Sequence, residues 1–242
     1  MKNIIENNFF NVCTEIGVSS SIKNSKFQLG QIFNSIPLKN KNILDVGGGS
    51  GYVSFYCKIK GGRDVVCLEP EDEGSNNEKN NSYEILNDRI DYDIEYLDKR
   101  IEDYNTKKKF DLIILHNSIN HLVDGNTKDL SSNDISKIKM MNTIEKISSL
   151  AADGCLLLIV DNSGYHFFQK LGFERHPLIP HVGFHDHESP DFWISYFKKF
   201  DFKFAKMDWI TPNPMGYFGK VLFNSSYASY LFGLPFRLVL EH

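Results

Sequence analysis

The sequence contains no run of about 18 apolar residues, so we expect no membrane-spanning helix. Its first eight residues lack the apolar core of a secretory signal peptide. The cysteines are far apart and form no Cys-x-x-Cys pair, which favours reduced thiols in a cytoplasmic protein over a disulfide framework. They are Cys13, Cys57, Cys67 and Cys155. The net charge of −4 disfavours a nucleic-acid partner, because such binders usually carry a basic patch.

Strand-like and helix-like runs alternate over most of the chain, which predicts βαβ units and a parallel sheet. The length of 242 residues suits one domain with a sizeable core. We expect strands at residues 42–46, 64–69, 92–97, 110–116 and 154–161, and helices at 4–16, 26–35, 52–59, 80–90 and 134–151. The run 156–160 is apolar on both faces, so it should be a central strand covered by helices on both sides.

A glycine cluster follows the first expected strand directly. Residues 43–51 read Ile-Leu-Asp-Val-Gly-Gly-Gly-Ser-Gly, and a helix-like stretch follows at once. Glycine lets the chain bend sharply and a ligand approach closely, and the helix N-terminus offers unpaired N–H groups. A dinucleotide-binding motif, Gly-x-Gly-x-x-Gly, that starts at Gly47 would need a glycine at its sixth position, where Tyr52 stands. The loop therefore does not match the motif that binds a pyrophosphate. The spacing suits the zwitterionic tail of an amino acid instead.

An acidic residue, Glu69, ends the second expected strand and is followed by Pro70. A carboxylate in this place can accept hydrogen bonds from both hydroxyls of a ribose. Dehydrogenases carry an acid there too, so Glu69 alone does not separate the two kinds of enzyme.

The segment from Ile43 to Gly51 resembles the cofactor loop of the class I S-adenosylmethionine (SAM) dependent methyltransferases, whose pattern is apolar-apolar-acid-apolar-Gly-x-Gly-x-Gly. Asp45 stands in the acidic place, and Gly47, Gly49 and Gly51 stand in the glycine places, with Gly48 between them. The resemblance implies an α/β, Rossmann-like fold: a seven-stranded, mostly parallel sheet with helices on both faces, a small cap and an antiparallel last strand. It implies SAM as the cofactor and S-adenosylhomocysteine (SAH) as its product.

The same resemblance assigns further residues to the cofactor. Asp45 would lie near the amino group of SAM, and Glu69 with Pro70 near the ribose. Arg100 and Ile101 would lie near the adenine. The polar cluster that begins at the end of the fourth expected strand would line the methionine end of the cofactor through His116 and Asn117.

Two histidines are candidates for a general base, because histidine transfers protons near neutral pH. His121 is the first and His187 the second; the alternative for His121 is helix capping or packing. The histidine-rich insertion may be read in three ways: its histidines contact the acceptor, supply a base, or satisfy loop carbonyls. His185, Asp186 and His187 offer metal ligands, but no further ligand at a compelling spacing accompanies them, so we predict no metal site.

The expected single domain has five parts. They are N-terminal helices (1–36), a cofactor-binding core (37–161), a cap insertion with a helix (162–200), C-terminal strands with an aromatic helical segment (201–239), and the remnant of a purification tag (240–242). The helix near Pro190 should be capped by Ser189. The aromatic stretch 215–236 should cover the sheet as a helix; a dimer surface and an acceptor lid are the alternatives.

Stretches at 115–124, 161–168 and 187–193 are similar to a bacterial group of class I methyltransferases whose genes often lie beside those for surface polysaccharides. Two positions depart from the wider pattern: Gly48, where many relatives have cysteine or another small residue, and Asp201, where a glycine is usual. We therefore expect methyl transfer from SAM to an oxygen or nitrogen of a small molecule, such as a sugar or a sugar-nucleotide precursor of a capsule. The alternatives are a nicotinamide-dependent oxidoreductase and a non-catalytic SAM-binding protein.

Overall fold

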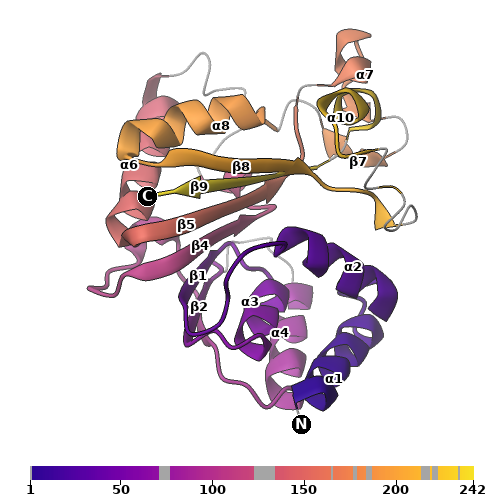
Figure 1. The fold of residues 1–242 in the computed structure, drawn as a ribbon, viewed down its shortest axis with the longest axis vertical. Helices are drawn as coiled ribbons and strands as arrows, with labels where there is room; N and C mark the ends of the chain where they lie inside the picture. Colours follow the sequence, from indigo (N-terminus) through magenta and orange to yellow (C-terminus); the bar gives the residue numbers. More distant parts are fainter. Residues whose placement is uncertain are drawn as a thin grey trace. The chain divides into compact units, whose positions relative to one another are not determined.

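The computed structural model describes residues 2–70, 77–122, 134–164, 166–176, 179–183, 187–213, 219, 223–233 and 235–242. The chain divides into two compact units, Met1–Ile114 and Leu115–His242. The main sheet has seven strands in the order β3-β2-β1-β4-β5-β9-β8 (Figure 1), and β4 (Phe110–His116) begins in the first unit and ends in the second. The predicted seven-stranded, mostly parallel sheet is therefore confirmed.

The strands of the first unit are parallel. β1 (Asn42–Val46) pairs with β2 (Asp64–Leu68) on one side and with β4 on the other, and β2 pairs with β3 (Glu95–Leu97). The direction in which the chain adds strands thus reverses at β1. Sheets of this type bind ligands at the carboxyl ends of the strands beside such a reversal, which is where the glycine loop begins.

Four helices of the first unit gather beside its strands (Figure 1): α1 (Lys2–Glu15), α2 (Ile22–Ile32), α3 (Tyr52–Ile59) and α4 (Asn77–Arg89). α1 contacts the other three, and α3 contacts β1 and β2. The fully buried ring of Phe9 in α1 stacks on Tyr52 of α3 with centroids 5.6 Å apart. This apolar seam joins the N-terminal helices to the helix that follows the glycine loop.

The second unit pairs its strands in antiparallel fashion. β9 (Phe236–Glu241) lies between β5 (Ala151–Asp161) and β8 (Lys203–Trp209) and is antiparallel to both, so the predicted antiparallel last strand is confirmed. Leu240 and Glu241 belong to β9, and the backbone N–H of His242 donates to the carbonyl of Cys155 at 2.9 Å. These bonds do not bear on whether the three residues come from a tag, which stays a prediction.

The helices of the second unit are α6 (Asp134–Leu150), α7 (Phe167–Lys170), α8 (Pro190–Phe197) and α10 (Ser226–Phe232), with short 3₁₀ turns η2 (Ile119–His121) and η4 (Lys198–Phe200). α8 contacts α6, β8 and β9. Ser189 caps α8 by accepting from the N–H of Phe192 at 3.2 Å, with Pro190 in the first turn, as predicted. After η4, Asp201 adopts the left-handed conformation (φ 66°) that the usual glycine would take, and aspartate is among the residues that tolerate it.

Several expected boundaries are wrong. α2 begins at Ile22 rather than residue 26, because the Ser21 hydroxyl accepts from the N–H of Asn24 and starts the helix earlier. β3 has only three residues instead of six, since only Glu95–Leu97 lie opposite β2. Residues 162–190, where the strand–helix alternation of the sequence breaks and an irregular insertion is expected, contain α7 and an antiparallel pair, β6 (Arg175–His176) and β7 (Ile179–Gly183). Of the described helices, none is both long enough and apolar enough to cross a membrane.

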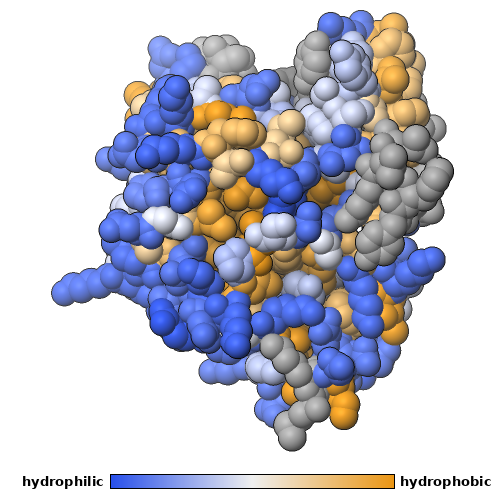
Figure 2. Space-filling view, in the orientation of Figure 1, coloured by the Kyte–Doolittle hydropathy of each residue, from blue (hydrophilic) through white to orange (hydrophobic). Residues whose placement is uncertain are grey.

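Five of the exposed large apolar side chains of the second unit lie in the turn after α7 or on α10, and these two helices contact each other. They are Leu171, Phe173, Tyr227, Leu231 and Phe232. Hydrophobic surface is visible in Figure 2 at the upper right, where Figure 1 draws α7. Part of the aromatic stretch, including Tyr217 and Phe218, lies outside the described residues, so its three interpretations stay predictions.

The Phe9 seam yields a stability prediction. Replacing Phe9 with Ala should lower the free energy of unfolding by about 3–5 kcal/mol, because the ring is fully buried against α3. Ile4→Ala on the same helix is the control, since Ile4 is 73% exposed and its loss should change stability by no more than about 0.5 kcal/mol. Urea denaturation of both variants measures the difference, and equal losses would contradict the packing described.

Candidate functional site

The glycine loop joins β1 to α3 through three residues in the left-handed region. Gly47, Gly49 and Gly51 have φ angles of 70°, 58° and 74°, which only glycine adopts readily. The N–H groups of Gly47 and Gly48 donate to the carbonyl of Leu68 at 2.8 and 3.2 Å. The loop is therefore held against the end of β2.

Gly48 and Gly49 differ in the space around them. A Cβ atom on Gly48 would collide with the Sγ of Cys67 and lie 2.8 Å from an Asp45 oxygen, so there is no room for a side chain. This explains the departure from the usual pattern: Cys67 fills the space that a side chain at position 48 would need. At Gly49 no described atom lies within 4 Å of such a Cβ. The backbone there faces open space, where a ligand can approach it.

Asp45, the last but one residue of β1, is fully buried beneath this loop. Its Oδ2 accepts a hydrogen bond from the Ser54 hydroxyl at 2.7 Å, whereas its Oδ1 is buried without a partner in the described part of the chain. Burial raises the pKa of Asp45 to about 7; the Ser54 hydrogen bond opposes this rise, and the nearby Glu69 carboxylate adds to it. An unmet buried oxygen costs about 1–3 kcal/mol, and a positively charged donor or a water would satisfy it.

Glu69 follows β2 and is largely buried. Its Oε2 accepts a hydrogen bond from the N–H of Gly49 at 2.9 Å, and the hydroxyl of Tyr96 in β3 donates to the carbonyl of Gly49 at 2.9 Å. The ring of Tyr96 is stacked on Tyr83 of α4, with centroids 3.8 Å apart. The ends of β2 and β3 thus both hold the glycine loop. Sequence reasoning missed Ser54, Cys67 and Tyr96, because their roles depend on contacts across the unit.

The residues assigned to adenine precede and begin the 3₁₀ turn η1 (Ile101–Asp103). Arg100 stands just before this turn and is half-buried, and its carbonyl accepts from the N–H of Asp103 at 3.1 Å. The Ile101 side chain is 2% exposed and belongs to the core. Pro70 is the last residue described before residue 77. Their contacts with a cofactor stay predictions.

The polar cluster of the second unit begins at the end of β4. Burial lowers the pKa of His116 to about 4, although the Asp161 carboxylate opposes this shift, so the imidazole is neutral at pH 7. Asn117 takes the left-handed conformation (φ 54°), and its N–H donates to the carbonyl of Val160 at 2.8 Å. This bond holds the cluster against β5.

Three side chains of the second unit meet at His187. Its Nδ1 lies 3.2 Å from Oδ1 of Asp161 and 2.8 Å from Nδ2 of Asn120. Asp161 is 2% and Asn120 5% exposed, and Oδ1 of Asn120 is buried without a partner among the described residues. Sequence reasoning named His187 but missed the other two. The sequence did contain a signal for Asp161: like Glu69, it is an acid at the carboxyl end of an apolar strand.

The other histidines differ from His187. His121 is exposed in η2, and its imidazole makes no hydrogen bond to another described residue, although its backbone N–H donates to Ser118. His166 caps α7 by accepting from the N–H of Phe168 at 3.1 Å. His185 and Asp186 lie outside the described residues. Within the described part of the chain, no three or more His, Cys, Asp or Glu side chains are grouped to hold a metal ion.

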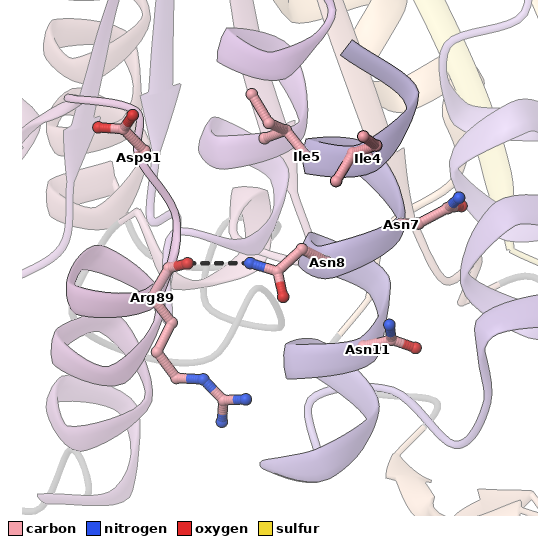
Figure 3. Close-up of a pocket in the computed structure, with 7 residues that line it drawn as sticks. All are labelled: Ile4, Ile5, Asn7, Asn8, Asn11, Arg89 and Asp91. Atoms are coloured by element: carbon pink, nitrogen blue, oxygen red, sulfur yellow. Dashed lines mark hydrogen bonds between the residues drawn. The ribbon is translucent and has the colours of Figure 1, made fainter. Parts of the chain in front are cut away.

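A groove of about 460 Å³ lies in the first unit between α1 and the end of α4 (Figure 3). Two isoleucines, three asparagines, Arg89 and Asp91 line it, and the Asn8 amide reaches across to donate to the Arg89 carbonyl at 3.0 Å. None of the residues predicted to bind the cofactor lines this groove. We therefore do not assign it to the reaction.

Comparison with known proteins decides the family. A family model described as a methyltransferase domain matches residues 27–206, which is most of the chain. The chain belongs to this methyltransferase family. The match includes the glycine loop, Glu69 and the polar clusters at the ends of β4 and β5, so the residues described above lie within the methyltransferase domain.

Solved structures share the fold of this methyltransferase at low sequence identity. A SAM-dependent methyltransferase from Mesorhizobium loti has a TM-score of 0.60 at 9% identity, covering 89% of this chain and 97% of its own. The N-methyltransferase NodS from Bradyrhizobium japonicum, in complex with SAH, has a TM-score of 0.56 at 11% identity, covering 90% and 85%. The magnesium protoporphyrin IX methyltransferase ChlM from Synechocystis, with bound SAH, has a TM-score of 0.56 at 14% identity, covering 100% and 99%.

Curated proteins match a shorter part of the methyltransferase. The histone-arginine methyltransferase CARMER of Drosophila ananassae is 29% identical over 93 residues, which is 38% of this chain and 17% of that protein. The same protein of Drosophila virilis matches at 29% identity over 16% of its length. The match therefore spans about a sixth of the length of these relatives.

The raised pKa of Asp45 predicts a pH dependence of stability. The folded protein keeps this proton up to about pH 7, whereas the unfolded chain loses it near 3.8, so wild-type stability falls as the pH rises between these values. The free energy of unfolding of Asp45→Asn, minus that of the wild type, should therefore rise by about 3 kcal/mol from pH 4 to pH 7. The lowered pKa of His116 makes stability rise with pH in both proteins, so its contribution cancels in this difference. Denaturation of both proteins across this range measures the difference, and a difference that stays constant from pH 4 to pH 7 would contradict the raised pKa of Asp45.

The crowding at Gly48 predicts a coupling between two substitutions. Gly48→Ala should destabilise the protein by about 1–3 kcal/mol, because its Cβ would collide with the Sγ of Cys67. In a Cys67→Ala background the same change should cost less, with part of the cost kept because an Asp45 oxygen remains close. Denaturation of the four proteins of this cycle measures the coupling, and an equal cost in both backgrounds would exclude the proposed collision.

Proposed function

We propose that this methyltransferase transfers a methyl group from SAM to an oxygen or nitrogen of a small molecule. The observation that carries the proposal is the glycine loop with its two acids. The loop presents its backbone to open space at Gly49, next to the unmet buried oxygen of Asp45 and the carboxylate of Glu69.

The two acids match the groups that SAM carries. Oδ1 of Asp45 is buried without a hydrogen-bond partner among the described residues, and the ammonium group of the methionine tail would supply a donor through water. Glu69 at the end of β2 would accept hydrogen bonds from the ribose hydroxyls, in exchange for the N–H of Gly49 that it now accepts. NodS and ChlM, which share the fold, were crystallised with SAH, and this supports SAM as the donor.

The reaction needs positioning more than activation by the protein. The methyl group of SAM is bound to a positively charged sulfur, which is already a good leaving group. Holding donor and acceptor in line can contribute about 7–11 kcal/mol in favourable cases. The predicted place of His116 and Asn117 at the methionine end agrees with a neutral His116, because a second positive charge there would oppose binding of the sulfonium.

A small-molecule acceptor is the proposal that the neighbours favour. ChlM is named for a porphyrin, and the histone-arginine enzymes match over only a sixth of their length. The sugar or sugar-nucleotide acceptor expected from the sequence rests on the resemblance to the polysaccharide-linked group alone. The family match speaks against the nicotinamide-dependent alternative.

Calorimetry tests the donor site. At pH 7 the Asp45 carboxyl is close to half protonated, and SAM, whose ammonium favours the ionised form, should release up to about half a proton on binding. Titrations in buffers with different ionisation enthalpies measure this release. Asp45→Asn should abolish the release, and Glu69→Gln should keep it. Both should weaken binding by about 10–100-fold, since a hydrogen bond to a charged group contributes about 1.5–3 kcal/mol. Unaltered affinity in both variants would refute the proposed donor site.

A further inference from the structure

The cluster of Asp161, His187 and Asn120 in the second unit has a chemistry that the donor site does not explain. We propose that Asp161 and His187 form a carboxylate–imidazole pair that removes the proton from an alcohol hydroxyl of the acceptor, with Asn120 as a positioning residue. The proposal rests on the proposed function and deepens it by naming the acceptor class.

Each member of the cluster is held by its own element. Asp161 is the last residue of β5, and its Oδ1 also accepts from the N–H of Asn162 at 2.6 Å. Asn120 is buried in η2. His187 stands two residues before Ser189, whose hydroxyl starts α8, and its side chain is 14% exposed. The imidazole is thus held through Nδ1, and part of the side chain stays exposed.

The distances decide which ring nitrogen of His187 carries the proton. Nδ1 is within hydrogen-bond distance of both Asp161 Oδ1 and the Asn120 amide. If Nδ1 accepted from the amide, its lone pair would face the buried carboxylate oxygen at 3.2 Å, and the two would repel. If Nδ1 carries the proton, it donates to Asp161, and turning the Asn120 amide over places its oxygen beside the same N–H. We therefore assign the proton to Nδ1, which leaves a lone pair on Nε2.

Asn120 adds a second observation that points to a ligand. As placed, the Asn120 amide has its Nδ2 2.8 Å from Nδ1 of His187 and its Oδ1 buried without a partner among the described residues; with the amide turned over, the NH₂ group takes that buried position. A buried amide atom in this state, beside a histidine that is held by a carboxylate, is suited to meet a polar group of a bound molecule.

The two other candidate histidines lack these features. His116 is neutral down to about pH 4, because burial lowers its pKa, and it is a weak base. His121 is exposed, and no carboxylate among the described residues pairs with its imidazole. His187 is therefore preferred over His121, the first candidate from the sequence.

The proposed step balances without another reactant. The acceptor oxygen attacks the methyl carbon as its O–H proton moves to Nε2 of His187. The carbon–sulfur bond breaks, and its electron pair stays on sulfur to give neutral SAH. The Asp161 carboxylate balances the imidazolium until the proton passes to solvent. An alcohol stays protonated near neutral pH and gains from a base, whereas a neutral amine can attack with its own lone pair.

The first test determines which ring nitrogen of His187 carries the proton. Long-range ¹H–¹⁵N spectra of the full chain, labelled on histidine and recorded near pH 7.5, identify the His187 signals by their loss in His187→Gln. We expect the Nδ1–H form in the wild type and in Asp153→Asn, an exposed acid on the same strand. Asp161→Asn should shift the population toward the Nε2–H form. An Nε2–H wild type, or an Asp161→Asn spectrum with an unchanged tautomer, would overturn the pair.

The second test measures turnover by SAH release with a panel of sugars, sugar nucleotides and the amino sugars of the same rings. With an alcohol acceptor, His187→Gln should lower kcat by about 10²–10⁴-fold, while KM and SAM affinity stay within a few-fold. Asp161→Asn and Asn120→Ala should lower kcat less, and Asp153→Asn should not lower it. Methylation confined to the amino groups, or full kcat in His187→Gln, would overturn the proposal. Loss of SAM binding in the wild type would instead refute the proposed function.

Discussion

The burial of Asp45 beneath the glycine loop is the constraint on which the proposed donor site depends. A carboxylate with no exposed surface needs donors, and the Ser54 hydroxyl supplies only one of them. Cys67 and Asp45 together occupy the space beside Gly48, so the loop must pass over them as bare backbone. Because the loop is pinned there, Gly49 is the point at which its backbone meets open space. The pKa of about 7 follows from the same burial, and it makes the site responsive to a positively charged ligand.

Three acids at or just beyond strand ends carry different tasks because their surroundings differ. Asp45 is paired with one hydroxyl and is close to half protonated at neutral pH. Glu69 accepts from the backbone of the loop, so it both shapes the loop and offers a carboxylate to a ligand. Asp161 accepts from a backbone N–H and lies against an imidazole. All three acids lie at or near the carboxyl ends of strands, which is where sheets of this type bind ligands. The hydrogen-bond partners of each acid decide its chemistry.

The order of strands and helices was predictable because it follows from apolar runs and turn residues. Gly47, Gly49 and Gly51 have the positive φ angles that their spacing suggested, and Ser189 caps its helix. The predicted boundaries failed where strand pairing sets the ends of an element. β3 is short because only three of its expected residues pair with β2. The predicted boundaries also failed at α2, where a side-chain hydrogen bond from the Ser21 cap begins the helix earlier than the apolar pattern does.

The sequence by itself determined the methyltransferase family, the glycine loop and the acids Asp45, next to the end of β1, and Glu69, just after β2. Each depends on backbone geometry or on residues that are neighbours in the chain. Only the tertiary structure decided that Cys67 fills the space beside Gly48 and that Asn120 meets His187, 67 residues further along. It also places the Asp161 carboxylate beside His187, and on that contact we propose His187 rather than His121 as the base. The physical reason is that a polar side chain acquires its role from the donors and acceptors packed against it, and the packing of distant elements brings these together.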